Sequence, residues 1–153
     1  MKSLPRSAIV LIILAVIGLV VMSVGQFASK STVFARGSLV LKDGLQTQAK
    51  GIRTVFIVIY DEESPAPMPY AAIREVLSED ASGEFLNFIL TKDNMQIMNQ
   101  QSHKTPSKLR IKARLDRSGT AGLDQPGDIV GELSGVSAGA EGLKIVLDRH
   151  LES

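Results

Sequence analysis

Residues 52–60 read Ile-Arg-Thr-Val-Phe-Ile-Val-Ile-Tyr and decide the fold of this 153-residue chain. From Val55 onward the run is apolar on both faces that a strand presents, which is typical of a strand covered on both sides. The segment that follows, Asp-Glu-Glu-Ser-Pro over 61–65, ends the strand with charged residues and a proline. The pattern therefore predicts a strand at the centre of a sheet.

Other short apolar runs flank this strand at fairly regular intervals and are separated by turn residues. In 109–115, Leu, Ile, Ala and Leu alternate with Arg, Lys and Arg, which is the period of a half-buried strand. Residues 70–77 favour a strand, with a helical turn as the alternative because of Ala71, Ala72 and Arg74. Further runs are 38–41, 85–91, 128–133 and 143–148. The spacing predicts an all-β fold, an immunoglobulin-like β-sandwich of about seven strands, since such domains have about 100 residues.

The first quarter of the chain does not share this pattern. Residues 8–24 carry no charge, and residues 7–27 would form a helix about 31 Å long, which matches a hydrocarbon core of about 30 Å. Lys2 and Arg6 ahead of the run also suit a secretory signal peptide, although its apolar core is usually only about 7–15 residues long. We expect one N-terminal transmembrane helix over 1–27, with a signal peptide as the alternative, a linker over 28–37 and a β-sandwich domain over 38–153.

Charge and cysteine content bear on the compartment. The chain has no cysteine, which suits an oxidising compartment. Positive residues flank both sides of the apolar segment, so their count does not decide the orientation, but long trailing domains translocate largely regardless of such counts. Leaving out Lys2, Arg6, Lys30 and Arg36, 13 basic residues face 16 acidic ones, a net charge of about −3 that gives no argument for nucleic-acid binding. We expect a single-pass protein whose domain lies outside the cytoplasm.

Three short motifs resemble one known family. Residues 65–74 read Pro-Ala-Pro-Met-Pro-Tyr-Ala-Ala-Ile-Arg, 111–119 read Ile-Lys-Ala-Arg-Leu-Asp-Arg-Ser-Gly, and 125–131 read Gln-Pro-Gly-Asp-Ile-Val-Gly. In their order and approximate spacing they resemble the C-terminal immunoglobulin-like domain of the cytochrome c-type biogenesis protein H family.

The resemblance implies a compartment and a task. That family assists haem attachment to apocytochromes c in the bacterial periplasm. It implies a non-catalytic accessory protein of the bacterial inner membrane, with haem-lyase components or apocytochrome c as partners. Family members usually also carry a tetratricopeptide region, and no helical repeat of about 34 residues occurs in this sequence.

The motif residues also have structural interpretations. Pro67 and Pro69 fix two φ angles and withhold two N–H donors, which suits a rigid strand entry. For Met68, between the two prolines, the favoured interpretation is a side chain buried in the core. The alternative is an exposed side chain that contacts a partner. Turn or bulge conformations with positive φ are expected at Gly119, Gly127 and Gly131, and the Asp128 carboxylate is expected to accept hydrogen bonds from turn amides. The segment of Pro67, Met68 and Pro69 remains a candidate contact for a partner protein.

A basic strand face is the most suggestive surface feature. The four cations that share it, at a spacing of two, are Lys108, Arg110, Lys112 and Arg114. The favoured interpretation is a solvated face neutralised across the sheet by acids such as Asp148, Glu132 or Glu84, or a guard against edge pairing. The alternative is a docking surface for an acidic partner, because guanidinium groups bind carboxylates well.

Metal binding and catalysis have weaker support. Thioether and imidazole ligands suit Cu(I), so Met95, Met98 and His103 are a candidate copper site, whereas the spacing of the two methionines equally fits one core-facing helical turn. The sequence holds no cysteine nucleophile, HExxH motif or glycine-rich phosphate loop. We predict a non-enzyme without a cofactor; a copper carrier and a structural subunit of a respiratory membrane complex are the alternatives.

Overall fold

The computed structural model describes residues 31–65, 68–99 and 104–152. The described part is all-β, with one short helix, α2 (Gln46–Ala49). The long strands, of eight or nine residues, are β1 (Val33–Leu41), β2 (Thr54–Asp61), β3 (Pro69–Val76), β4 (Glu84–Thr91), β6 (Lys108–Asp116), β7 (Ile129–Ser137) and β8 (Ala140–Leu147). Two strands of two residues each are added, β5 (Gln96–Ile97) and β9 (Arg149–His150). The predicted all-β fold is confirmed.

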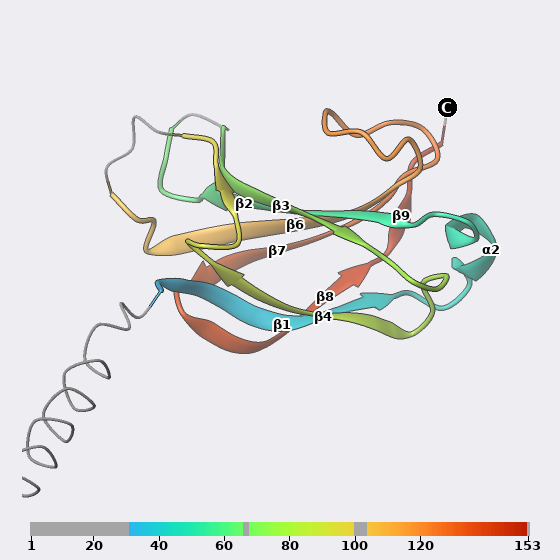
Figure 1. Cartoon of the computed structure of the whole chain (residues 1–153), viewed down its shortest axis with the longest axis horizontal. Helices are drawn as coiled ribbons and strands as arrows, with labels where there is room; N and C mark the ends of the chain where they lie inside the picture. Colours follow the sequence, from blue (N-terminus) through green and yellow to red (C-terminus); the bar gives the residue numbers. More distant parts are fainter. Residues whose placement is uncertain (1–30, 66–67, 100–103, 153) are drawn as a thin grey trace, which may run out of the picture. The chain divides into compact units, whose positions relative to one another are not determined.

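The strands form two sheets that pack face to face as a sandwich (Figure 1). The smaller sheet has the order β4-β1-β8, and the larger has the order β5-β3-β2-β6-β7-β9. Every described strand pair is antiparallel except β1 with β8, which run parallel. The predicted strand over 52–60 is β2, and it lies inside the larger sheet between β3 and β6, as its apolar run indicated.

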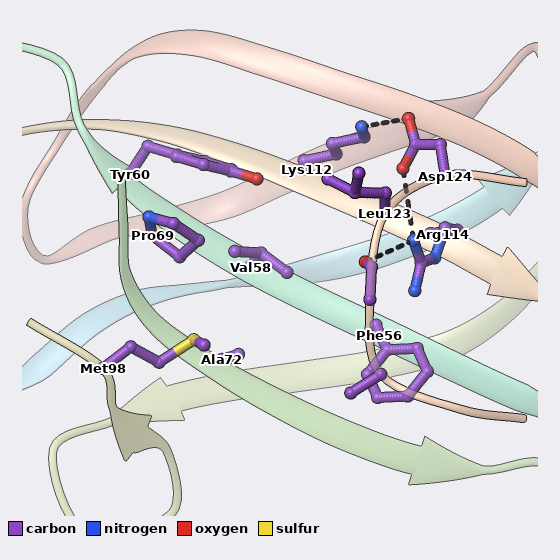
Figure 2. A pocket seen from close by; sticks show the side chains of 12 residues that line it. Phe56, Val58, Tyr60, Pro69, Ala72, Met98, Lys112, Arg114, Leu123 and Asp124 are labelled. Atoms are coloured by element: carbon purple, nitrogen blue, oxygen red, sulfur yellow. Dashed lines mark hydrogen bonds and ion pairs between the residues drawn. The ribbon is translucent and has the colours of Figure 1, made fainter. Parts of the chain in front are cut away.

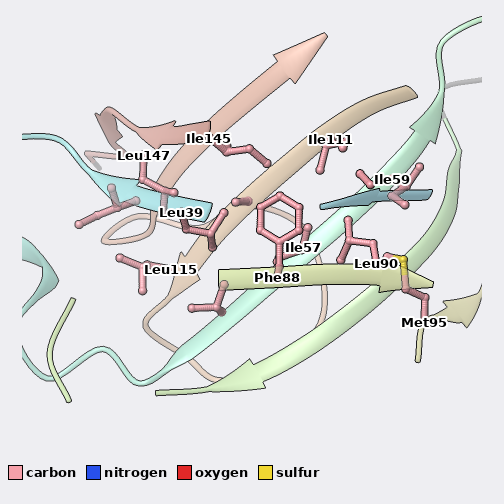
Figure 3. Packing of buried hydrophobic residues seen from close by; sticks show 14 of the residues in the cluster. Leu39, Ile57, Ile59, Phe88, Leu90, Met95, Ile111, Leu115, Ile145 and Leu147 are labelled. Atoms are coloured by element: carbon pink, nitrogen blue, oxygen red, sulfur yellow. The ribbon is translucent and has the colours of Figure 1, made fainter. Parts of the chain in front are cut away.

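The core lies between the sheets, and the two-residue period of the strands decides which side chains enter it (Figure 3). On β2, Ile57 and Ile59 are fully buried among core residues of both sheets, including Leu39 and Leu90. Their neighbours on the strand therefore point to the outer face of the larger sheet.

One expectation about strand boundaries needs correction. The N-terminal strand begins at Val33, inside the range predicted as linker, because Phe34 and Ala35 are fully buried in the core. The apolar run over 38–41 is only the second half of this strand, which extends through Gly37 toward the N-terminus. The strand predicted over 70–77 is confirmed as β3, which runs from Pro69 to Val76, and the alternative helical turn does not form.

Gly131 has a role other than the expected turn. It lies within β7 and is absent from the described residues with positive φ, which include Gly119 and Gly127. A Cβ atom at Gly131 would lie 2.1 Å from the Val146 carbonyl oxygen, so glycine is required by the close approach of β8. Gly131 thus permits a backbone contact rather than an unusual backbone angle.

The predicted membrane helix over 1–27 lies outside the described residues. Within the part that is described, no helix has the length and apolar character needed to cross a membrane.

Candidate binding groove

A groove of about 370 Å³ lies on the outer face of the larger sheet (Figure 2). Its floor is formed by the outward positions of β2 together with β3, namely Phe56, Val58, Tyr60, Pro69 and Ala72. These positions alternate with the core residues of the same strands, because successive side chains of a strand point to opposite faces. The floor is therefore an apolar surface that the sandwich core does not use.

Two exposed apolar side chains line the groove from opposite sides. Figure 2 shows Leu123 on one side of Val58 and Met98 on the other. Leu123, in the loop after β6, is 89% exposed, and Met98, just after β5, is 54% exposed. The Met98 backbone N–H donates to the Tyr70 carbonyl at 2.9 Å, which fixes this wall to β3. Both side chains therefore offer apolar area to a bound molecule.

Two buried carboxylates fasten the loop that carries Leu123. Asp116, at the end of β6, accepts hydrogen bonds from the Gly119 N–H at 2.6 Å and the Ser118 hydroxyl at 2.8 Å. Asp128, just ahead of β7, accepts from the Arg117 N–H at 3.0 Å and from the Gln125 N–H at 2.9 Å. The loop is thus tied to the sheet at both ends by side-chain-to-backbone hydrogen bonds.

Arg114 lies at the centre of an ionic cluster beneath this loop. Its guanidinium contacts Asp116 at 2.8 Å, Asp124 at 3.3 Å and Asp128 at 3.7 Å, the last an ion pair too long for a hydrogen bond. It also donates to the Gly122 carbonyl at 2.9 Å and lies 5.2 Å from the centre of the Phe56 ring. Only 7% of this side chain is exposed. Arg114 therefore holds the loop over the sheet through contacts within the domain.

Asp124 joins the loop to a second cation, Lys112, through a hydrogen-bonded ion pair. Partial burial raises the pKa of Asp124, but the hydrogen bonds and charges of Lys112 and Arg114 outweigh it and hold this pKa below its ordinary value of 3.8. Asp124 is therefore ionised at neutral pH and neutralises the cations beside the groove.

The remaining cations of the basic strand face differ in environment. The Arg110 guanidinium lies 4.2 Å from the centre of the Tyr60 ring and pairs with Glu132 at 3.2 Å. Lys108 is exposed and forms no ion pair with the described residues. Of the acids expected across the sheet, Glu132 has this role. Glu84 and Asp148 pair with none of the four cations in the described part of the chain; Asp116, Asp124 and Asp128 do so instead.

The proline segment is only partly described, since Pro67 lies outside the described residues. The core position favoured for Met68 is wrong: its side chain is 59% exposed, because β3 enters the sheet only at Pro69. Pro69 pairs with Tyr60 at an irregularity in the β2–β3 ladder and lines the groove.

The two methionines of the copper hypothesis lie on different sides of the larger sheet. Met95 is buried in the core, whereas Met98 lines the groove on the outer face, and the stretch between them is strand β5 rather than a helical turn. The two sulfur ligands are therefore separated, and His103 lies outside the described residues. Among the residues that are described, no three or more His, Cys, Asp or Glu side chains are grouped as a metal site.

Sequence reasoning missed the groove itself. Phe56, Val58 and Tyr60 were noted only as part of an apolar run, although their alternation with core residues places them on one outer face. Leu123 also had a signal, because it is the one large apolar residue in the polar loop Ser-Gly-Thr-Ala-Gly-Leu-Asp-Gln-Pro-Gly over 118–127.

Fold and site together define a two-sheet β-sandwich domain with an apolar groove on the outer face of its larger sheet. The chain belongs to the cytochrome c-type biogenesis protein H Ig-like domain family, whose model matches residues 36–148. The resemblance expected from the three motifs is thereby confirmed. Comparison with curated proteins and with solved structures gave no significant match.

Proposed function

We propose that this chain is a membrane-anchored periplasmic accessory protein of cytochrome c maturation, and that it acts by binding a protein partner through the groove. Family membership over residues 36–148 supports the process. The exposed apolar groove carries the proposal of binding, since an uncovered apolar surface flanked by polar residues is typical of an interaction site. The apolar segment over 7–27 supports an anchor in the bacterial inner membrane.

The charges around the groove favour binding over catalysis. Lys112, Arg114 and Asp124 are engaged with one another, and Arg110 is held between Tyr60 and Glu132. A general acid or base needs a group that is free to exchange a proton with a substrate. The groove instead offers apolar contact area, so its role is to hold or recruit haem-lyase components or apocytochrome c.

Deletion of the gene in its own host tests the process. We expect c-type cytochromes, measured by haem staining of membranes, to be lost while b-type cytochromes remain, and the full-length chain to restore them. Unchanged haem staining would overturn the proposal. Normal haem attachment with loss of an assembled respiratory complex would instead support the structural-subunit alternative.

Topology is tested separately. A reporter that is active only in the periplasm, fused after Ser153, should be active and should sediment with the membrane fraction. A soluble mature product that begins near Gln26 would show that the apolar segment is a cleaved signal peptide.

A further inference from the structure

The charge pattern around the groove limits what can occupy it. The cations along β6 form ion pairs within the domain, with the exception of Lys108, the first residue of the strand. On the opposite side of the floor, Arg74 of β3 is directly across from Phe56 of β2. Residues directly opposite on neighbouring strands share a face, so Arg74 lies on the groove face of β3, beside Phe56. Arg74 is exposed and forms no ion pair with any residue in the described ranges.

The dimensions of the floor select the form of the occupant. Phe56, Val58 and Tyr60 follow one another at alternate positions of a single strand, so the floor is about 13 Å long at about 3.3 Å per residue. A volume of about 370 Å³ is at the small end of the usual range for ligand sites. It admits a few side chains of an extended segment but not an α-helix, whose diameter with side chains is about 10–12 Å.

We propose that the groove binds an extended segment of a partner protein that carries two apolar side chains at alternate positions and a carboxylate next to them. The apolar side chains lie on Phe56, Val58 and Tyr60, between Met98 and Leu123. The carboxylate pairs with Arg74 at the Phe56 end. The inference deepens the proposed function, because it specifies the chemistry of the partner segment that the groove recognises.

The structure explains why Leu123 and Arg74 carry this recognition. Leu123 is the most exposed large apolar side chain among the described residues, yet its loop is fixed by Asp116 and Asp128, so little ordering entropy is lost when a segment covers it. Arg74 has no competing carboxylate within the described chain, so pairing with a partner breaks no existing ion pair.

The test uses the full-length chain in lipid nanodiscs, which cover its apolar N-terminal segment. Binding of a fluorescein-labelled peptide, Gly-Ser-Leu-Thr-Leu-Glu-Glu-Ser, is followed by fluorescence polarisation. Leu123→Ser is expected to raise Kd about tenfold, since it removes one buried apolar side chain from the interface. Ile89→Ser is the matched control, because Ile89 is 52% exposed but lies on a strand of the smaller sheet. It should leave Kd unchanged.

The ionic contact is tested with a second peptide in which both Glu residues are replaced by Gln. Arg74→Gln is expected to raise Kd about two- to fivefold for the Glu peptide at low salt, and to leave the Kd of the Gln peptide unchanged. The difference should shrink as salt screens the pair. Lys144→Gln is the matched charge control, since Lys144 lies on β8 of the smaller sheet.

Three outcomes would overturn the inference: no binding of the Glu peptide, equal effects of Leu123→Ser and Ile89→Ser, or displacement of the peptide by free oleate, which would reassign the groove to a lipid. Failure here is distinguishable from failure of the proposed function. If the peptide does not bind but gene deletion abolishes c-type cytochromes, the accessory role stands and another surface recruits the partner. If the peptide binds but deletion is silent, the groove inference stands and the assigned process does not.

Discussion

Arg114 belongs to the basic strand face, but in the structure it is a buried residue that holds a loop against the sheet. A guanidinium that is 7% exposed has lost most of its hydration, and the carboxylates of Asp116 and Asp128 are even less exposed, at 1% each. Such a cluster is stable only while its charges compensate one another, since an uncompensated buried charge is costly. Asp116, Asp124 and Asp128 compensate the charge of Arg114, and Asp116 and Asp128 also accept backbone hydrogen bonds from the loop. Charge compensation and loop geometry therefore depend on the same residue.

Replacing Arg114 tests this dependence. Arg114→Gln is expected to lower the free energy of unfolding by about 3–5 kcal/mol, because two buried carboxylates lose their counter-charge. Arg110→Gln breaks a half-exposed ion pair with Glu132 and should cost about 1 kcal/mol or less. Urea unfolding followed by circular dichroism measures both. Similar losses for the two variants would contradict the assignment of Arg114 as a buried structural residue.

Asp124 should give the loop a measurable acid sensitivity. Its pKa is lower in the folded chain than the ordinary value of 3.8, so its contribution to stability is complete above that value and disappears as the pH falls through 3.8 toward the folded-state pKa. At neutral pH Asp124→Asn should cost about 1 kcal/mol. The difference between the native chain and this variant should shrink as the pH falls from neutrality to below 3.8. A difference that stays constant over this range would contradict the ion pairing.

At the scale of elements, periodicity predicts strands well and contacts between loops poorly. The alternation in 109–115 and the apolar run in 52–60 are local patterns, and both strands formed as expected. The ion-pair partners of Arg114 depend on how the loop over 117–127 folds back onto the sheet. The alternation of polar and apolar residues along a strand gives no information on that conformation. The same holds for Gly131, whose requirement arises from the approach of β8. The groove could not be predicted from the apolar run in 52–60. Because that run is apolar on both faces, it does not indicate which face packs in the core and which lies on the outside.

The two faces of β2 can be separated by substitution at adjacent positions. Ile57→Asp places a charge in the core, where Ile57 is fully buried, and should cost several kcal/mol, enough to unfold a domain of this size. Val58→Asp places the same charge on the half-buried groove floor, where water can reach it, and should leave a cooperative thermal transition. If Val58→Asp unfolds the chain as Ile57→Asp does, the outer face of β2 is not a solvent-accessible groove.

At the scale of the whole molecule, the smaller sheet decides where the domain begins. Its central strand is β1, which pairs with β4 on one side and, in parallel, with β8 near the C-terminal end of the described chain. The first residues of β1 extend into the range that the sequence suggested as linker, and Phe34 packs edge-on against Tyr70 with ring centres 5.7 Å apart. A domain that began at residue 38, as the hydrophobic pattern suggests, would lack Phe34 and therefore this contact. The pattern places the boundary there because the residues just before Ser38 are a short mixture of polar and apolar types.

Two fragments test this boundary. Residues 31–153 should unfold cooperatively in urea, whereas residues 38–153 should be less stable by at least about 3 kcal/mol, since they lack the fully buried Phe34 and Ala35. For a domain whose total stability is about 5–15 kcal/mol, such a loss leaves the shorter fragment marginal. Phe34→Ala within 31–153 separates the side chain from the strand: it should cost about 3–5 kcal/mol while the ladder to β4 and β8 remains. Equal unfolding midpoints for the two fragments would mean that residues 31–37 add nothing to the fold, and would restore the domain boundary to residue 38.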